Sequence, residues 1–261
     1  MHGPAVVDRI RRSFLALIFA AAALAAAAPA SHAFEQPLSG RLTPEFMHFF
    51  DTLALTADYG PFNNRPPWAR KWAAPVRVFL DGPAEKLRGQ VEDVLQRFSV
   101  WTGLPFTLMP PGATAAPGSP DTIRVKLFPR PAFKRLYRTR DVVCQTETRG
   151  IGGTLQVGYI AVSEGYTDCL RHEFMHALGF DSHWCPNHPT EIHSVLALRD
   201  SAARSDDYSP WDILAIRVLY DWRIRAGMNR QKSLTIAYEV IQQHPQSASL
   251  PAGTAVTAAS R

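Results

Sequence analysis

The stretch DCLRHEFMHALG, residues 168–179, decides what the rest of the chain is expected to be. It holds two histidines, His172 and His176, with Glu173 directly after the first, in the pattern His-Glu-x-x-His. Residues four apart share one face of an α-helix, so both imidazoles can reach the same metal ion. In this pattern the glutamate is not a ligand but takes a proton from a water that the metal has acidified. The motif therefore predicts a hydrolytic metal site.

The simplest alternative is that both histidines only decorate the surface of an amphipathic helix. With about 100° per residue, Phe174 and Leu178 fall on the same side as Leu170, and both histidines fall on the opposite side. This placement disfavours histidines packed in the core. It leaves two interpretations, a solvated helix face and a metal site that faces a cleft.

The residues after the motif favour the metal site. Gly179 stands where the helix should end, and a left-handed glycine there lets the chain turn back under the metal. Five of the nine histidines lie within 22 residues, and further ligand types crowd the same stretch. We predict zinc held by His172, His176 and His183. Four residues remain open as alternatives for the third ligand: Asp181, His188, His193 and Cys185. Asp181 is also a candidate acceptor for the imidazole N–H of a ligand.

The remaining pattern predicts an α+β fold with a twisted mixed sheet. Alternating apolar residues predict strands at 76–80, 104–109 and 122–128, and a hairpin of 142–148 with 154–162. The clearest helix is 84–102, expected as the single crossover that a parallel pair of strands needs. Further helices are expected from residue 43, across the motif and near the C-terminus. Residues 126–140 are basic, and a solvated loop is the favoured interpretation.

The motif, its glycine and the following ligand resemble the metzincin class of zinc endopeptidases. In that class the third ligand lies three residues after the glycine, whereas this chain has Ser182 there and His183 one residue later. Residues 192–196 occupy the place of the methionine-containing turn, with Leu196 at the methionine position. The resemblance implies a zincin-like fold, zinc as cofactor, Glu173 as general base and a peptide or protein substrate. It also implies that an extended peptide adds to the strand 142–148, beside Val143 and Gln145.

Residues 140–241 are also similar to an uncharacterised, exported, zincin-like family of bacterial proteins. The similarity rests on residues 168–170 and 177–179 of the motif region, and on 219–221 and 225–228 downstream. Many members of that family lack the full histidine pair, which this chain has. The presence of both histidines raises the expectation of activity.

The N-terminus predicts export. Residues 1–33 read as a signal peptide, with basic residues up to Arg12, an Ala/Leu-rich stretch and small residues before a cut after Ala33. Residues 34–245 are expected as one domain and 246–261 as a disordered tail. The three cysteines then sit in an oxidising compartment, where Cys144–Cys169 is the favoured disulfide and pairing with Cys185 stays open.

The predicted function is an exported zinc endopeptidase of the periplasm or exterior. The net charge of +5 falls to +3 without the two net positive charges of the leader (5 − 2), too little to indicate a nucleic-acid partner. No apolar run after the leader is long enough to insert stably in a membrane, and the oligomeric state is left open. The alternatives are a zinc hydrolase of cell-wall peptide or amide bonds and a non-catalytic, zinc-stabilised binding domain.

Overall fold

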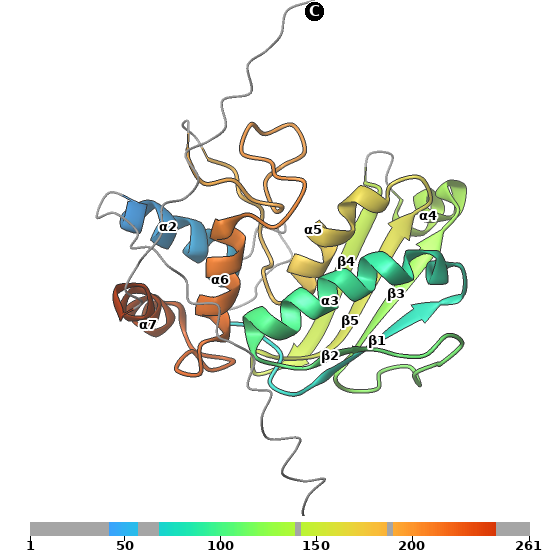
Figure 1. Ribbon diagram of the computed structural model, residues 1–261, viewed down its shortest axis with the longest axis horizontal. Coiled ribbons are helices and arrows are strands. Elements are labelled where there is room, and N and C mark those ends of the chain that lie inside the picture. Colours follow the sequence, from blue (N-terminus) through green and yellow to red (C-terminus); the bar gives the residue numbers. More distant parts are fainter. Residues whose placement is uncertain (1–41, 57–67, 139–141, 187–189, 244–261) are drawn as a thin grey trace, which may run out of the picture. The chain divides into compact units, whose positions relative to one another are not determined.

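The computed structural model describes residues 42–56, 68–138, 142–186 and 190–243. The predicted leader and tail lie outside these residues. The strands are β1 Val76–Asp81, β2 Phe106–Leu108, β3 Thr122–Phe128, β4 Cys144–Ile151 and β5 Thr154–Ser163. They form a five-stranded sheet in the order β2-β1-β3-β5-β4, with helices beside it (Figure 1). The expected α+β class with a mixed sheet is therefore confirmed.

The strand pairing is more parallel than the sequence suggested. The pairs β1–β2, β1–β3 and β3–β5 are all parallel, whereas β4 pairs antiparallel with β5. The expectation of a single parallel crossover was wrong, because the loop before β3 and the segment between β3 and β5 also cross the sheet. The hairpin β4–β5 was expected, and it places β4 at the edge.

The helices are α2 Leu42–Phe50, α3 Arg88–Thr102, α4 Arg130–Tyr137, α5 Leu170–Ala177, α6 Pro210–Tyr220 and α7 Arg230–Gln243. Short turns precede or follow three of them: η1 Asp51–Leu55, η2 Gly82–Leu87 and η3 Thr167–Cys169. Figure 1 shows α3 and α5 over the same face of the sheet, with α2, α6 and α7 grouped beyond α5. The contacts of α6 with both α3 and α7 join the two groups.

Helix α3 buries one apolar stripe against the sheet and the other helices. Val91, Val94, Leu95 and Phe98 are at most 2% exposed, as expected for residues that recur at helical spacing. The helix begins at Arg88, four residues later than predicted, because Gly82–Leu87 first forms the 3-10 turn η2. Gly103 ends α3 in the left-handed region with φ of 72°.

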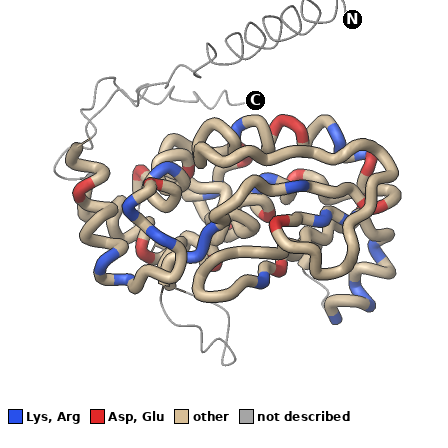
Figure 2. The backbone as a smooth tube through the Cα atoms, turned by 90° about the horizontal axis from the view of Figure 1, so that it is seen from below, with Lys and Arg blue, Asp and Glu red and all other residues tan. Residues whose placement is uncertain are grey.

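Helix α4 replaces the loop that we predicted for the basic segment. The basic composition suggested a solvated loop, yet Pro131 fits the first turn of the helix, where its missing N–H is not needed. Phe133 is the buried anchor of this helix, at 1% exposed. Along the described backbone as a whole, blue basic and red acidic residues are interspersed (Figure 2).

A disulfide ties the edge strand to the segment before α5. Cys144 opens β4 and Cys169 ends η3, and the two are joined as predicted. The link fixes the end of the edge strand next to the helix that carries the histidines. Among the described residues, no helix is long and apolar enough to cross a membrane.

Candidate metal centre

Helix α5 carries the histidine motif between the sheet and a long loop. Leu170 and Phe174 are at most 2% exposed and anchor the helix in the core. The helix ends before Gly179, whose φ is 109°. A Cβ at this position would lie 2.1 Å from the carbonyl oxygen of Arg70, so only glycine allows this close approach. The turn directs the chain back toward the histidines.

The three predicted ligands meet at one point. The Nε2 atom of His172 lies 3.1 Å from Nε2 of His176 and 3.2 Å from Nε2 of His183. One donor atom from each ring lies within 4.8 Å of the other two. Nitrogen ligands about 2.0–2.1 Å from a tetrahedral ion are separated by about 3.3 Å, which these distances approach. The three histidines are therefore positioned to bind one metal ion.

Backbone carbonyls orient two of these rings. The Nδ1 atom of His172 lies 2.7 Å from the carbonyl oxygen of Val195, and that of His176 lies 2.5 Å from the carbonyl oxygen of Phe180. Each Nδ1–H donates to its carbonyl, which leaves the lone pair on Nε2 for a metal. For His172 and His176, the two carbonyls and not Asp181 take this acceptor role.

Burial keeps these imidazoles neutral. It lowers the pKa of His172 to about 3 and lowers the pKa of His176 well below its ordinary value. The neighbouring imidazoles act in the same direction, because positive charges this close repel one another. A neutral imidazole is the form that binds a metal, so the site needs no deprotonation near neutral pH.

Glu173 lies beside the imidazoles in a nearly water-free position. Its side chain is 6% exposed, and burial raises the pKa of its carboxyl to about 7. The hydroxyl of Thr146 on β4 donates to the carbonyl oxygen of Glu173 over 3.0 Å, which fastens α5 to the edge strand. A carboxyl with this pKa can both accept and release a proton near neutral pH.

A cavity of about 480 Å³ contains the three imidazoles and Glu173. One wall is formed by residues 142–146, which are the two residues before β4 and its first three, including the disulfide-bonded Cys144. The opposite wall is the loop from Ala197 to Asp206. The histidines are thus reached from a cleft rather than from the open surface.

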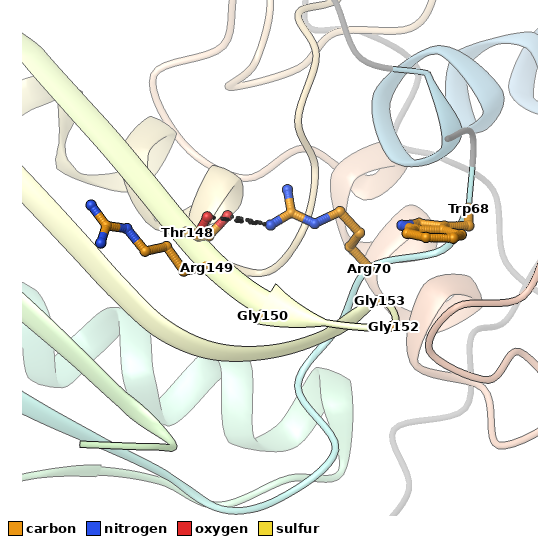
Figure 3. A pocket seen from close by; sticks show the side chains of 7 residues that line it. All are labelled: Trp68, Arg70, Thr148, Arg149, Gly150, Gly152 and Gly153. Carbon is orange, nitrogen blue, oxygen red and sulfur yellow. Dashed lines mark hydrogen bonds between the residues drawn. The ribbon is translucent and has the colours of Figure 1, made fainter. Parts of the chain in front are cut away.

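The alternatives for the third ligand lie elsewhere. The carboxylate of Asp181 pairs with the guanidinium of Arg70, which also donates to Thr148 Oγ1 over 2.9 Å (Figure 3). His193 and Cys185 are exposed and lie outside the group of three imidazoles. His188 is outside the described residues.

A buried carboxylate, which the sequence analysis missed, holds the loop over His172. Asp212 is fully buried and accepts hydrogen bonds from Ser194 Oγ (2.6 Å), Val195 N (3.1 Å) and Ser209 N (2.9 Å). These bonds fix the residue whose carbonyl orients His172. Ser209 and Asp212 also form the capping box of α6. The spacing Ser-Pro-Trp-Asp is a recognisable helix start, so this role had a signal in the sequence.

Arg204 is the second residue that we did not anticipate. It lines the cavity, and its Nη1 lies 3.1 Å from Nδ1 of His172. No spacing or periodicity marks it in the sequence.

Comparisons of the chain with family models, with curated proteins and with solved structures give no match.

Proposed function

We propose that this chain is an exported zinc endopeptidase with a zincin-like fold. The observation that carries the proposal is the meeting of three Nε2 atoms in the cavity that also holds the carboxyl of Glu173. Three imidazoles suit zinc, and three protein ligands leave a fourth position for a reactant. Among the described residues, no other group of histidine, cysteine and acidic side chains is arranged to hold a metal ion.

Zinc, when bound, supplies the Lewis acidity that lets a water molecule lose a proton near neutral pH. The carboxylate of Glu173 takes that proton while the water oxygen attacks the peptide carbonyl. The protonated Glu173 then gives the proton to the leaving nitrogen as the peptide C–N bond breaks. The sum is one water consumed and one new carboxyl and one new amine formed. A pKa of about 7 suits both halves of this transfer.

The edge strand supplies a place for the substrate backbone. In the described sheet β4 pairs on one side only, with β5, and its first residues line the cavity beside Glu173. An extended peptide can add to the other side through main-chain hydrogen bonds, which need little sequence preference. Val143 and Gln145 lie in this part of the chain, and their replacement tests the binding mode.

Other features agree with the metzincin resemblance. Gly179 ends the motif helix in a tight turn, and residues 194–197 turn under His172 with the Val195 carbonyl as its partner. Leu196, at the position of the methionine, is fully buried and supplies the same apolar support. The added residue before His183 is absorbed by the loop, since its ring still reaches the other two.

The experiment compares purified wild type with Glu173→Gln. Both proteins are expected to hold one zinc per chain, and only wild type should cleave an unfolded protein. Val143→Glu should raise KM, because the larger, charged side chain hinders the addition of a substrate strand at this edge. Zinc binding without cleavage of any peptide by wild type would contradict the proposal. Cleavage of cell-wall fragments but not of unfolded protein would contradict the endopeptidase proposal and favour a hydrolase of cell-wall peptide or amide bonds.

A further inference from the structure

Arg204 places a cation in the wall of the metal cavity. It lies on the loop opposite β4, where its backbone forms a bridge with Ser194. Its Nη1 donates to the carbonyl oxygen of Ala197 over 3.0 Å. This bond holds the guanidinium beside His172, 3.1 Å from Nδ1. The arginine is therefore fixed next to the proposed reacting centre.

Arg204 forms no ion pair with a described carboxylate, although its charge acts on the carboxyl of Glu173 across the cavity. Within the described parts of the chain, no carboxylate lies within 4.0 Å of its guanidinium, although eight other arginines have such partners. Those are Arg70, Arg88, Arg97, Arg124, Arg149, Arg171, Arg223 and Arg230. The cavity also contains Arg199, Asp168 and Asp206, all three exposed. Arg204 is only partly exposed, so its charge is less screened by water than theirs.

One edge of the guanidinium, with two N–H donors, remains for a ligand. Among the described residues, Arg204 donates one hydrogen bond, from Nη1 to the carbonyl oxygen of Ala197. Its Nε and Nη2 form the planar pair of donors that matches a carboxylate in two parallel hydrogen bonds. A carboxylate there would lie beside the imidazoles and Glu173, as part of the substrate.

We propose that Arg204 binds a carboxylate of the substrate next to the bond to be cleaved. The inference rests on the proposed peptidase function and names its substrate class. The carboxylate has two possible sources, an Asp or Glu side chain within the peptide or the free C-terminus. A side chain makes the enzyme an endopeptidase for acidic sequences, and a C-terminus makes it trim chain ends.

A purely structural role for Arg204 predicts different results. Its bond to Ala197 could simply hold the loop, in which case removal would weaken zinc binding and affect all peptides alike. Arg204→Met removes the charge and keeps much of the bulk. Arg204→Lys keeps the charge without the paired donors. Zinc affinity of each variant therefore reports loop damage separately from substrate choice.

The test measures peptide binding to the zinc-loaded Glu173→Gln protein, which needs no turnover. Three fluorescent peptides are compared: one with an internal Glu and an amidated C-terminus, its Gln counterpart, and the Gln peptide with a free C-terminus. One of the two carboxylate peptides should bind about tenfold more tightly than the neutral peptide. Arg204→Met should abolish the difference and leave zinc bound, and Arg204→Lys should keep only part of it.

Two matched controls sharpen the result. Arg77 is an exposed arginine on β1 outside the cavity, and Arg77→Met should keep the full preference. Asp206→Asn removes a negative charge from the cavity wall and should tighten carboxylate binding. Equal binding of all three peptides, no binding of any peptide, or a preference that survives Arg204→Met overturns the inference.

Activity separates this inference from the proposed function. If wild type cleaves peptides equally well with and without a carboxylate, and Arg204→Met cleaves them at the same rate, the inference is wrong and the proposed peptidase function stands. If carboxylate binding depends on Arg204 but the protein cleaves no peptide, the proposed peptidase function is wrong and the binding site at Arg204 stands.

Discussion

The sheet and the described parts of the loop after α5, residues 180–186 and 190–206, are built by different physical means. Ile123 and Val125 in β3, like the inner face of α3, are at most 2% exposed and pack by apolar contact. The loop also buries apolar side chains such as Trp184 and Leu196, but the position of Val195 is set by the buried carboxylate of Asp212 with its three donors. Apolar packing tolerates small shifts, whereas a buried hydrogen bond is lost outright. The difference places the fold's stability in the sheet and the metal geometry in the loop.

Replacing one residue in each region tests this division. We expect these two substitutions to have the largest effects on the free energy of unfolding. Ile123→Ala should lower the free energy of unfolding by about 3–4 kcal/mol through the cavity it leaves. Asp212→Ala should cost about 3 kcal/mol, because several buried donors lose their acceptor. Only Asp212→Ala should also weaken zinc binding, by about tenfold or more, because Val195 no longer holds His172. Urea unfolding and zinc titration measure both quantities.

The control for the loop is Asp93→Asn, which alters partly exposed ion pairs with Arg97 on α3 and Arg171 on α5. It should change stability by less than about 1 kcal/mol. Equal zinc affinity in Asp212→Ala and wild type would show that the loop does not depend on this carboxylate.

The disulfide ties the sheet to the segment before α5 and should give the next largest effect. Cys144→Ser with Cys169→Ser removes a link across 25 residues, and the predicted loss is about 3 kcal/mol by loop entropy. The edge strand and the start of α5 should then open more readily, seen as faster amide exchange in both. Unchanged exchange at β4 would mean that the sheet alone holds the edge.

Lys71 extends the comparison to a polar group inside the packed region. Its Nζ donates to the carbonyl oxygens of Leu219, Asp221 and Ile224 at 2.7–3.2 Å, and burial lowers its pKa to about 8. The unfolded chain keeps its proton up to the ordinary value of 10.5, so folding releases a proton between the two values. Stability from this group is lowest below pH 8 and rises through pH 10.5.

Lys71→Met isolates that pH dependence. The difference in unfolding free energy, wild type minus variant, should rise by no more than about 3 kcal/mol between pH 8 and 10.5. Thermal unfolding at several pH values measures it. A difference that is flat, or that falls, would show that the three carbonyls stabilise the charged amine fully.

Ser209→Ala gives the smallest effect. The hydroxyl of Ser209 accepts from the backbone N–H of Asp212 and donates to the carbonyl oxygen of His193, so it joins α6 to the loop. Its loss should cost about 1–2 kcal/mol. Ser209→Thr should restore most of this, and a large loss in both variants would point to a packing defect instead.

The parts that sequence could predict follow from periodicity and spacing. The apolar stripe of α3 and the alternation in β3 predicted those elements, and the four-residue spacing predicted the paired imidazoles. The disulfide followed from its place beside the motif. The choice of Cys144–Cys169 and the meeting of His183 with the other two histidines are both present in the structure.

Other parts depend on contacts between segments far apart in the chain. The pairing of Arg70 with Asp181 spans 111 residues and withdraws Asp181 from the metal. Arg204 reaches the cavity only through the course of its loop. Helix α4 was missed because proline-rich, basic sequence lacks the apolar repeat of a buried helix, although one phenylalanine suffices to anchor it.

Zinc titration of wild type and His183→Ala tests the central claim most directly, that three imidazoles converge on one ion. Wild type should bind one zinc per chain, and the variant should bind it at least about 100-fold more weakly. Full affinity in the variant, with one zinc still bound, would contradict the account and move the third ligand to another residue.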